Sequence, residues 1–289
     1  MTQREQKTAL PEEYDFNLSD FALFLSVMKN KEAYESLLSI IMDEKELELT
    51  EIKVEQVVLN KSGKRAIRLD AWGLDKENRQ FNTEMQNDSS SDDIRKRARY
   101  YQGLLDSPVL KSGKQTRYKQ LPSTVIIFIT QEDIFGRDFA KYTFTERCRE
   151  IPDMELMDGT KKIFLNMKSK KGKPELVSLL QYIKNTKLDN PEIQVQDKRL
   201  IKLDTIVKEV KSSEEWEAVK MNILEIGIQK GREEGIEEGR KEGRSEGIKI
   251  LLETYRELGL SREEAAAKLK EKFHLSEEDT EEYSIRYWK

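Results

Sequence analysis

Two residue types that carry much of enzyme chemistry are almost missing from this sequence. Its 289 residues contain one cysteine, Cys148, and one histidine, His274. A lone cysteine excludes an internal disulfide and a cysteine-rich zinc site, and a lone histidine excludes a HExxH zinc helix. A Ser-His-Asp or Cys-His triad would have to use His274, which lies in a charged segment typical of a helix end. Any bound metal must therefore be held by oxygen ligands, which favours Mg²⁺ or Mn²⁺ over zinc.

Long hydrophobic runs are missing as well. No stretch approaches the roughly 18 apolar residues of a membrane span, and the N-terminal residues lack the apolar run of a signal peptide. Hydrophobic and charged residues each make up 37% of the chain, which is typical of a protein with a modest core and a large solvated surface. We therefore expect no membrane partner and a location in the reducing cytoplasm.

The net charge of −4 hides an uneven distribution along the chain. Residues 1–60 carry 6 basic and 13 acidic side chains, whereas residues 95–120 carry 8 basic side chains against Asp106 alone. Residues 161–173 add six lysines and no acid. Basic segments contact the phosphates of nucleic acids, but charge runs also occur as ordinary solvated faces. Charge alone leaves both interpretations open.

Hydrophobic periodicity predicts a definite order of elements. Residues 18–42 have helical spacing, either as one helix or as two short helices broken near residues 29–31, with Ser19 or Asp20 as the N-cap. Three extended segments follow, then a helix capped by Ser91 or Asp92, and then a continuous apolar run typical of a buried strand. The predicted order is helix, three strands, helix, strand. In residue numbers, the later elements are strands 52–60, 66–74 and 79–86, helix 92–105 and strand 125–130.

Four further segments are predicted to complete the same domain. They are strands at 142–145 and 162–166, a helix at 174–184, and a long helix from about 197 into 228.

The C-terminal part opens with a repeat in which glycine recurs every four residues, from Gly227 to Gly247. Each interior glycine costs a helix roughly 1 kcal/mol relative to alanine, so a helix here is marginal alone. Two interpretations stay open: a helix that pairs with a second copy or a partner, and a flexible charged tether. Residues 248–289 then read as a small helical unit, in which Gly259 closes one helix and Ser261 caps the next.

A pair of carboxylates stands out in the predicted hairpin centred near Glu77. Asp70 falls opposite Glu84, and Gln86 projects from the same strand face as Glu84. Carboxylates directly opposite one another repel, and a divalent cation between them removes the repulsion and can promote phosphodiester hydrolysis. Spacing alone is equally compatible with an exposed acidic pair on a solvated sheet face.

At this point the sequence resembles a known family, the PD-(D/E)XK nuclease family transposases, also called recombination-promoting nucleases. The likeness extends over about residues 15 to 225, and glycine-repeat tails are also common in that family. The matching segments are RLDAWGLDKENRQFNTEMQ, RKRARYYQGLLDSPVLKSGKQTRYKQLPSTVIIFI, YTFTERC, MELMDGTKKIFLN and SSEEWEAVKMN.

The resemblance implies an α/β fold with the restriction-endonuclease-like αβββαβ core, a mixed sheet flanked by helices, here with a helical C-terminal extension. It assigns Asp70 and Glu84 as catalytic metal ligands. Gln86 stands where the wider superfamily has lysine, although the family itself commonly shows ExQ. A neutral glutamine can orient water or a phosphate oxygen but supplies no positive charge. The missing cation is expected from the following helix, where Arg97 or Arg99 could face the scissile phosphate.

Three further residues are candidates for accessory roles. Asp20 resembles the family's N-terminal Asp, although residues 21–24 lack the lysine often found nearby. Tyr100 and Tyr101 are expected to divide between core packing and a hydroxyl hydrogen bond, with stacking on a base as the alternative.

These observations predict a Mg²⁺-dependent DNA endonuclease of low sequence specificity, linked to recombination, mobile elements or defence against foreign DNA. The alternatives are a catalytically silent DNA-binding or assembly protein of the same fold and a strand-transferring transposase. Expected partners are DNA and a second copy of the chain, bound through the C-terminal tail. The predicted domains are residues 1–226 (nuclease), 227–247 (charged helix or tether) and 248–289 (helical unit). Predicted DNA-binding residues are Arg95, Arg97, Arg99, Lys111, Lys114, Arg117 and Lys119.

Overall fold

The centre of the molecule is a mixed six-stranded sheet with the strand order β1-β2-β3-β4-β6-β5. The computed structural model describes residues 15–58, 65–87, 92–110 and 116–288. β1, β2 and β3 are antiparallel neighbours, β3, β4 and β6 run parallel, and β5 returns antiparallel to β6. The strands are β1 (Leu49–Val58), β2 (Ile67–Asp75), β3 (Arg79–Gln86), β4 (Ser123–Thr130), β5 (Lys141–Phe144) and β6 (Thr160–Asn166).

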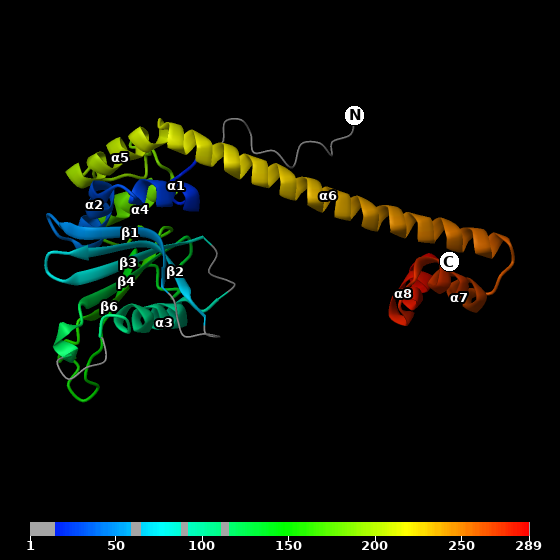
Figure 1. Cartoon of the computed structure of the whole chain (residues 1–289), viewed down its shortest axis with the longest axis horizontal. Helices are drawn as coiled ribbons and strands as arrows, with labels where there is room; N and C mark the ends of the chain where they lie inside the picture. Colours follow the sequence, from blue (N-terminus) through cyan, green and yellow to red (C-terminus); the bar gives the residue numbers. More distant parts are fainter. Residues whose placement is uncertain (1–14, 59–64, 88–91, 111–115, 289) are drawn as a thin grey trace. The chain divides into compact units, whose positions relative to one another are not determined.

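Helices cover both faces of this sheet (Figure 1). One face packs against α1 (Phe21–Met28), α2 (Lys31–Met42), α4 (Pro174–Lys184) and α5 (Lys198–Lys211), and the other against α3 (Ile94–Asp106). A short 3₁₀ turn, η1 (Tyr118–Gln120), precedes β4. The predicted fold class, with its order of helix, three strands, helix and strand, is confirmed.

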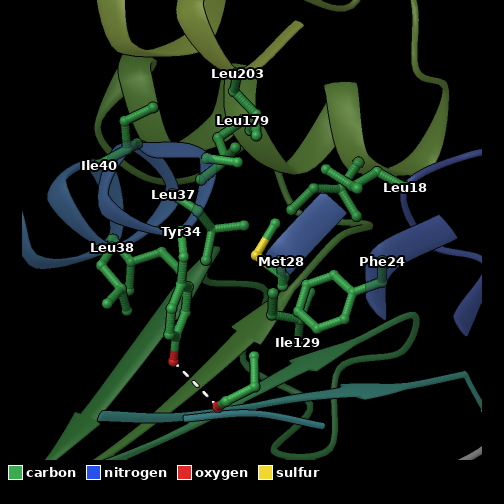
Figure 2. Close-up of a cluster of buried hydrophobic side chains, with 14 of the residues drawn as sticks. Leu18, Phe24, Met28, Tyr34, Leu37, Leu38, Ile40, Ile129, Leu179 and Leu203 are labelled. Atoms are coloured by element: carbon green, nitrogen blue, oxygen red, sulfur yellow. Dashed lines mark hydrogen bonds between the residues drawn. The ribbon is translucent and has the colours of Figure 1, made fainter. Parts of the chain in front are cut away.

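The larger core lies between the sheet and the four-helix face. Figure 2 shows Leu37, Leu179 and Leu203 from three different helices packed together above the sheet. Tyr34 is fully buried there, and its hydroxyl lies 3.1 Å from Thr83 Oγ1 on β3 and donates to the carbonyl of Ala71 on β2. Because buried polar groups need partners, this contact fixes α2 against the strands that carry the predicted carboxylates.

Three local predictions need correction or completion. Residues 18–42 form two helices: Lys29 is the C-cap of the first, and the Asn30 side chain caps the second by accepting from the amides of Glu32 and Ala33. α3 is capped by Asp93, not by Asp92, since its carboxylate accepts from the amides of Arg95 and Lys96. The long helix predicted from about residue 197 into 228 is wrong, because α5 ends at Lys211 and a new helix begins at Glu214.

The C-terminal helices form a unit of their own. One compact unit ends at Val219 and the next begins at Lys220. α6 (Glu214–Glu257) is continuous through the glycine repeat, and its last turns pack on α7 (Arg262–Phe273) and α8 (Glu277–Tyr287) through a small apolar cluster. Gly259 has a φ of +79° and Ser261 caps α7, as predicted. No helix among the described residues is long and apolar enough to cross a membrane.

Candidate active site

Asp70 and Glu84 lie side by side on neighbouring strands. The β2–β3 ladder pairs Ala71 with Thr83 and keeps this register to the hairpin turn. Continued by one residue, the register places Asp70 opposite Glu84, as the sequence predicts. The regular ladder of backbone hydrogen bonds stops just before them. At the two carboxylates, side chains therefore take part in the hydrogen bonds between the strands.

Each carboxylate takes over a backbone hydrogen bond across this gap. The amide of Asp70 donates to Glu84 Oε1 at 3.1 Å, and the amide of Met85 donates to Asp70 Oδ2 at 2.9 Å. Both acceptors are carboxylate oxygens and both donors are backbone amides, whose positions are set by the strands. The side chains are therefore held in fixed orientations by the main chain itself.

The ladder on the other side of Asp70 is also interrupted. β1 and β2 pair Val54 with Ala71 and then Gln56 with Leu69, and the intervening Glu55 has a φ of +53°. Leu69 and Trp72 both belong to the α3-side cluster, although strict alternation would send residues three apart to opposite faces. The strand is thus irregular at Asp70, as is common beside functional sites.

Both carboxylates are withdrawn from water. Asp70 is 7% exposed and Glu84 is 0% exposed. Burial is the main reason that the pKa of each carboxyl is raised above its usual value, and the charge of Asp70 raises the pKa of Glu84 further. Nearby cationic and hydrogen-bonding groups oppose this effect. Burying two neighbouring acids destabilises the folded state. Because stability does not explain the arrangement, it points to a function.

The face of β3 that points toward α3 carries a further polar side chain beside the two carboxylates. Asn82, two residues before Glu84, is fully buried, and its Nδ2 donates to Glu84 Oε1 at 3.1 Å. Its Oδ1 is buried without a hydrogen-bond partner in the described structure. Sequence analysis missed this residue. The available signal was its position on the same strand face as Glu84 and Gln86.

Arg97 joins the two other predicted residues of β3. Its guanidinium donates to Glu84 Oε2 at 2.9 Å and to Gln86 Oε1 at 2.8 Å. The sequence predicted Arg97 as a DNA contact and, together with Arg99, as a source of the missing cation; the structure turns Arg97 inward, onto Glu84 and Gln86. Tyr101, one turn further along α3, is buried and accepts a hydrogen bond from Arg97 Nε.

A comparison with known families matches the part of the chain that contains this strand pair and its buried Asp and Glu. Residues 15–225 match the PD-(D/E)XK nuclease family transposases. The chain belongs to this family. No curated protein and no solved structure gave a match.

A divalent metal is general to PD-(D/E)XK nucleases, and the residues of this site fit one. Asp70 and Glu84 offer hard carboxylate oxygens, which suit Mg²⁺ or Mn²⁺. Asp70 Oδ1 accepts no hydrogen bond from a described residue, so it can serve a further ligand. Within the described residues no group of three His, Cys, Asp or Glu side chains could hold a metal. Mg²⁺ commonly binds through one or two carboxylates with water and phosphate completing its shell, so two are sufficient.

Four of the remaining basic residues predicted for this nuclease family member are described by the structure, and all four are exposed. Arg95 and Arg99 are exposed on α3, and Arg95 pairs with Asp93. Arg117 and Lys119 are exposed around η1. Two more predicted residues lie outside the described structure; they are Lys111 and Lys114.

The accessory candidates separate into two kinds. Asp20 is the N-cap position of α1 and accepts from the amide of Asn17. The neighbouring Ser19 carbonyl accepts from Asn87, which follows β3, so the start of α1 lies beside the end of the site strand. Tyr100 is partly exposed, and its hydroxyl donates to the carbonyl of Arg65. Tyr101 contacts the site through Arg97.

Proposed function

We propose that this protein is a Mg²⁺-dependent DNA endonuclease with little sequence specificity. Membership of the nuclease family supports a nuclease- or transposase-related function with DNA as its partner. The observation that carries the proposal is the burial of Asp70 and Glu84 side by side, each oriented by a backbone amide of the other strand. Such a pair is unfavourable without a cation and suited to hold one.

The residues divide the work of hydrolysis. Asp70 and Glu84 hold Mg²⁺, or Mn²⁺, which when bound neutralises charge on the scissile phosphate and favours ionisation of the attacking water. The water oxygen forms a bond to phosphorus while a phosphorus–oxygen bond of the backbone breaks, giving a phosphate monoester and a hydroxyl group. Gln86 orients the water or a phosphate oxygen through its amide.

Exposed basic residues hold the DNA strand against the site. Contacts between arginine or lysine and phosphates carry no sequence information, which accounts for the proposed low specificity. We place the activity in the cytoplasm, in recombination, in the spread of mobile elements or in defence against foreign DNA.

A plasmid assay tests the proposal. Purified protein should nick supercoiled DNA with Mg²⁺ and lose that activity when EDTA removes the metal. Asp70→Ala should abolish cleavage while circular dichroism shows an unchanged fold, because one of the two carboxylates is gone. Glu51→Ala is a matched control, since Glu51 is an exposed acid on β1, and it should cleave like the wild type.

The same assay separates the alternatives. A catalytically silent DNA-binding or assembly protein would bind DNA, and wild type and Asp70→Ala would nick equally little. A strand-transferring transposase would also join a 3′ hydroxyl end to a second duplex, which labelled oligonucleotides would reveal. Equal nicking by wild type and Asp70→Ala would refute the proposed site.

A further inference from the structure

Arg97 contacts both polar side chains at the end of β3 with one guanidinium. Nη2 lies 2.9 Å from Glu84 Oε2 and Nη1 lies 2.8 Å from Gln86 Oε1. Two parallel acceptors two residues apart on a strand suit the planar fork of arginine. A lysine, with a single nitrogen, matches this geometry less well.

The guanidinium is itself fixed from two other sides. Arg97 Nε donates to the hydroxyl of Tyr101 at 2.8 Å. Its central carbon lies 5.0 Å from the ring centroid of Tyr101 and 5.5 Å from that of the buried Phe128 on β4. Cation–π contact with two rings and a hydrogen bond leave Arg97 little freedom to turn toward solvent. Arg95 and Arg99, by contrast, are exposed on the same helix.

This arrangement sets the direction of the Gln86 amide. Arginine can only donate hydrogen bonds, so it must meet the amide oxygen of Gln86. The amide nitrogen, which is the donor end, is thereby turned away from Arg97. An amide nitrogen is the end of a glutamine that donates to a water or phosphate oxygen, which is the role proposed for Gln86.

The same contact completes the surroundings of Glu84. Oε2 meets Arg97, while Oε1 accepts from Asn82 and from the amide of Asp70. Among the described residues, each hydrogen bond to the Glu84 carboxylate thus comes from a group held by the sheet or by α3. The positive charge that contacts Glu84 directly comes from the helix, through Arg97, whereas Gln86 on the strand is neutral.

We propose that Arg97 is a positioning residue for the nuclease site. It orients the Glu84 carboxylate and the Gln86 amide, and it places on α3 the positive charge that Gln86 does not carry. This inference rests on the proposed function. Two simpler roles are distinct outcomes of the test: a direct contact to DNA phosphate, and an ion pair that serves folding alone.

The first measurement compares Arg97→Gln with Arg99→Gln on an oligonucleotide substrate. Arg97→Gln should lower kcat by about 100-fold, a loss typical of removing one oriented electrostatic contact, with KM changed less than about threefold. Its DNA affinity without divalent metal should also be unchanged. Arg99→Gln should show the opposite division, with weaker binding and kcat preserved. An unchanged kcat in Arg97→Gln, or a loss confined to DNA affinity, overturns the proposal.

Moving the charge tests positioning against folding. In the double variant Gln86→Lys with Arg97→Gln, the cation returns to the strand, and kcat should recover at least about tenfold over Arg97→Gln alone. Gln86→Lys by itself sets two cations side by side and should be inactive. A purely structural ion pair predicts no recovery.

Should Arg97→Gln fail to fold, Tyr101→Phe replaces it, because that variant keeps the ring and removes only the hydrogen bond. Tyr101→Phe should lower kcat with the melting temperature nearly unchanged.

A measurement without metal or DNA keeps this inference separate from the proposed function. Arg97→Gln and Glu84→Gln should not be additive in unfolding free energy, because each removes the same contact. Additive effects would show that the contact is not formed and would overturn the inference even in an active enzyme. Non-additivity together with a wild type that cleaves no DNA would contradict only the proposed function.

Discussion

At the residue scale, the site depends on backbone donors that no residue pattern reveals. The amides of Asp70 and Met85 are ordinary strand groups. They donate to the carboxylates only because the β2–β3 ladder stops at Ala71 and Thr83. Asn82 is likewise an unremarkable strand residue until it is seen donating to Glu84. These groups donate hydrogen bonds to two buried acids and so replace the water that would otherwise stabilise their charge.

Replacement of Asp70 by asparagine should stabilise the metal-free protein. The amide keeps an oxygen to accept from Met85, removes one of two buried charges, and leaves Arg97 to balance Glu84. We expect a gain on the order of 1 kcal/mol in unfolding free energy, of the size typical when a functional site gives up strain. Thermal melting with and without Mg²⁺ checks this, and the wild type should gain more from Mg²⁺ than the variant.

Asp75→Asn supplies the comparison on the same strand. Asp75 is buried and accepts from Arg79, which also pairs with Glu44, so its loss leaves a network incomplete. This variant should be less stable than the wild type. A destabilised Asp70→Asn would indicate that the acidic pair contributes to folding.

At the scale of elements, α3 presents two different faces. Ala98, Tyr101 and Leu105 pack against the sheet, while Arg95 and Arg99 point to solvent. An amphipathic helix beside the site can thus position catalytic groups and contact DNA at once.

The exposed face of α3 should contribute salt-dependent DNA affinity. Arg95→Gln with Arg99→Gln should weaken binding to all sequences alike and reduce the slope of log K against log salt by about 1 per residue. Fluorescence anisotropy over a salt series measures both quantities. A slope equal to that of the wild type would remove these arginines from the DNA contact.

Three glycines in the middle of α6 are not required by contacts with the described residues of the chain. A Cβ added at Gly235, Gly239 or Gly243 would meet nothing within 4 Å. Each still lowers helix stability by roughly 1 kcal/mol relative to alanine. Close approach of a second copy, one of the two interpretations of the repeat, would account for their presence and stays a prediction.

The triple variant Gly235→Ala, Gly239→Ala and Gly243→Ala should therefore have two opposite effects. Helicity at 222 nm should rise, because alanine favours the helix, while the mass in light scattering should fall toward the monomer. A higher helicity with an unchanged mass would assign the glycines no part in self-association.

At the scale of the whole molecule, two compact units are encoded in one chain. The sheet and its helices contain the candidate site and the larger core, whereas the C-terminal cluster is small, with Ile248, Leu252, Ala265, Leu269 and Leu275 at its centre. The unit with the larger core should not depend on the other for folding, since its core residues all come from within it.

Deletion of residues 227–289 tests this division. The shortened protein should melt cooperatively, cleave DNA, and show a lower oligomeric mass in light scattering. If paired copies place two sites near one duplex, the plasmid product should shift from linear toward nicked. An unchanged mass would refute oligomerisation through the tail, and loss of the cooperative transition would show that the first unit needs the second.

The sequence by itself determined most of the elements and the pairing of Asp70 with Glu84. Periodicity gave β3 and α4 with their observed ends, and hairpin symmetry about Glu77 put Asp70 opposite Glu84. It did so because short-range pattern and strand register depend on residues close in sequence. The same locality explains why the break after Lys211 was missed, since Trp216 in the next helix is buried in the core by tertiary contacts.

Only the tertiary structure decided what surrounds the acidic pair. The sequence left open whether Arg97 or Arg99 supplies the cation of the site, because a run of basic residues on a helix carries no sign of which member faces inward. The contacts of Arg97 with Glu84 and Phe128 join α3 to β3 and β4, strands that are distant from one another in sequence. Burial and charge balance at a site are sums over such distant neighbours, and they exist only once the chain has folded.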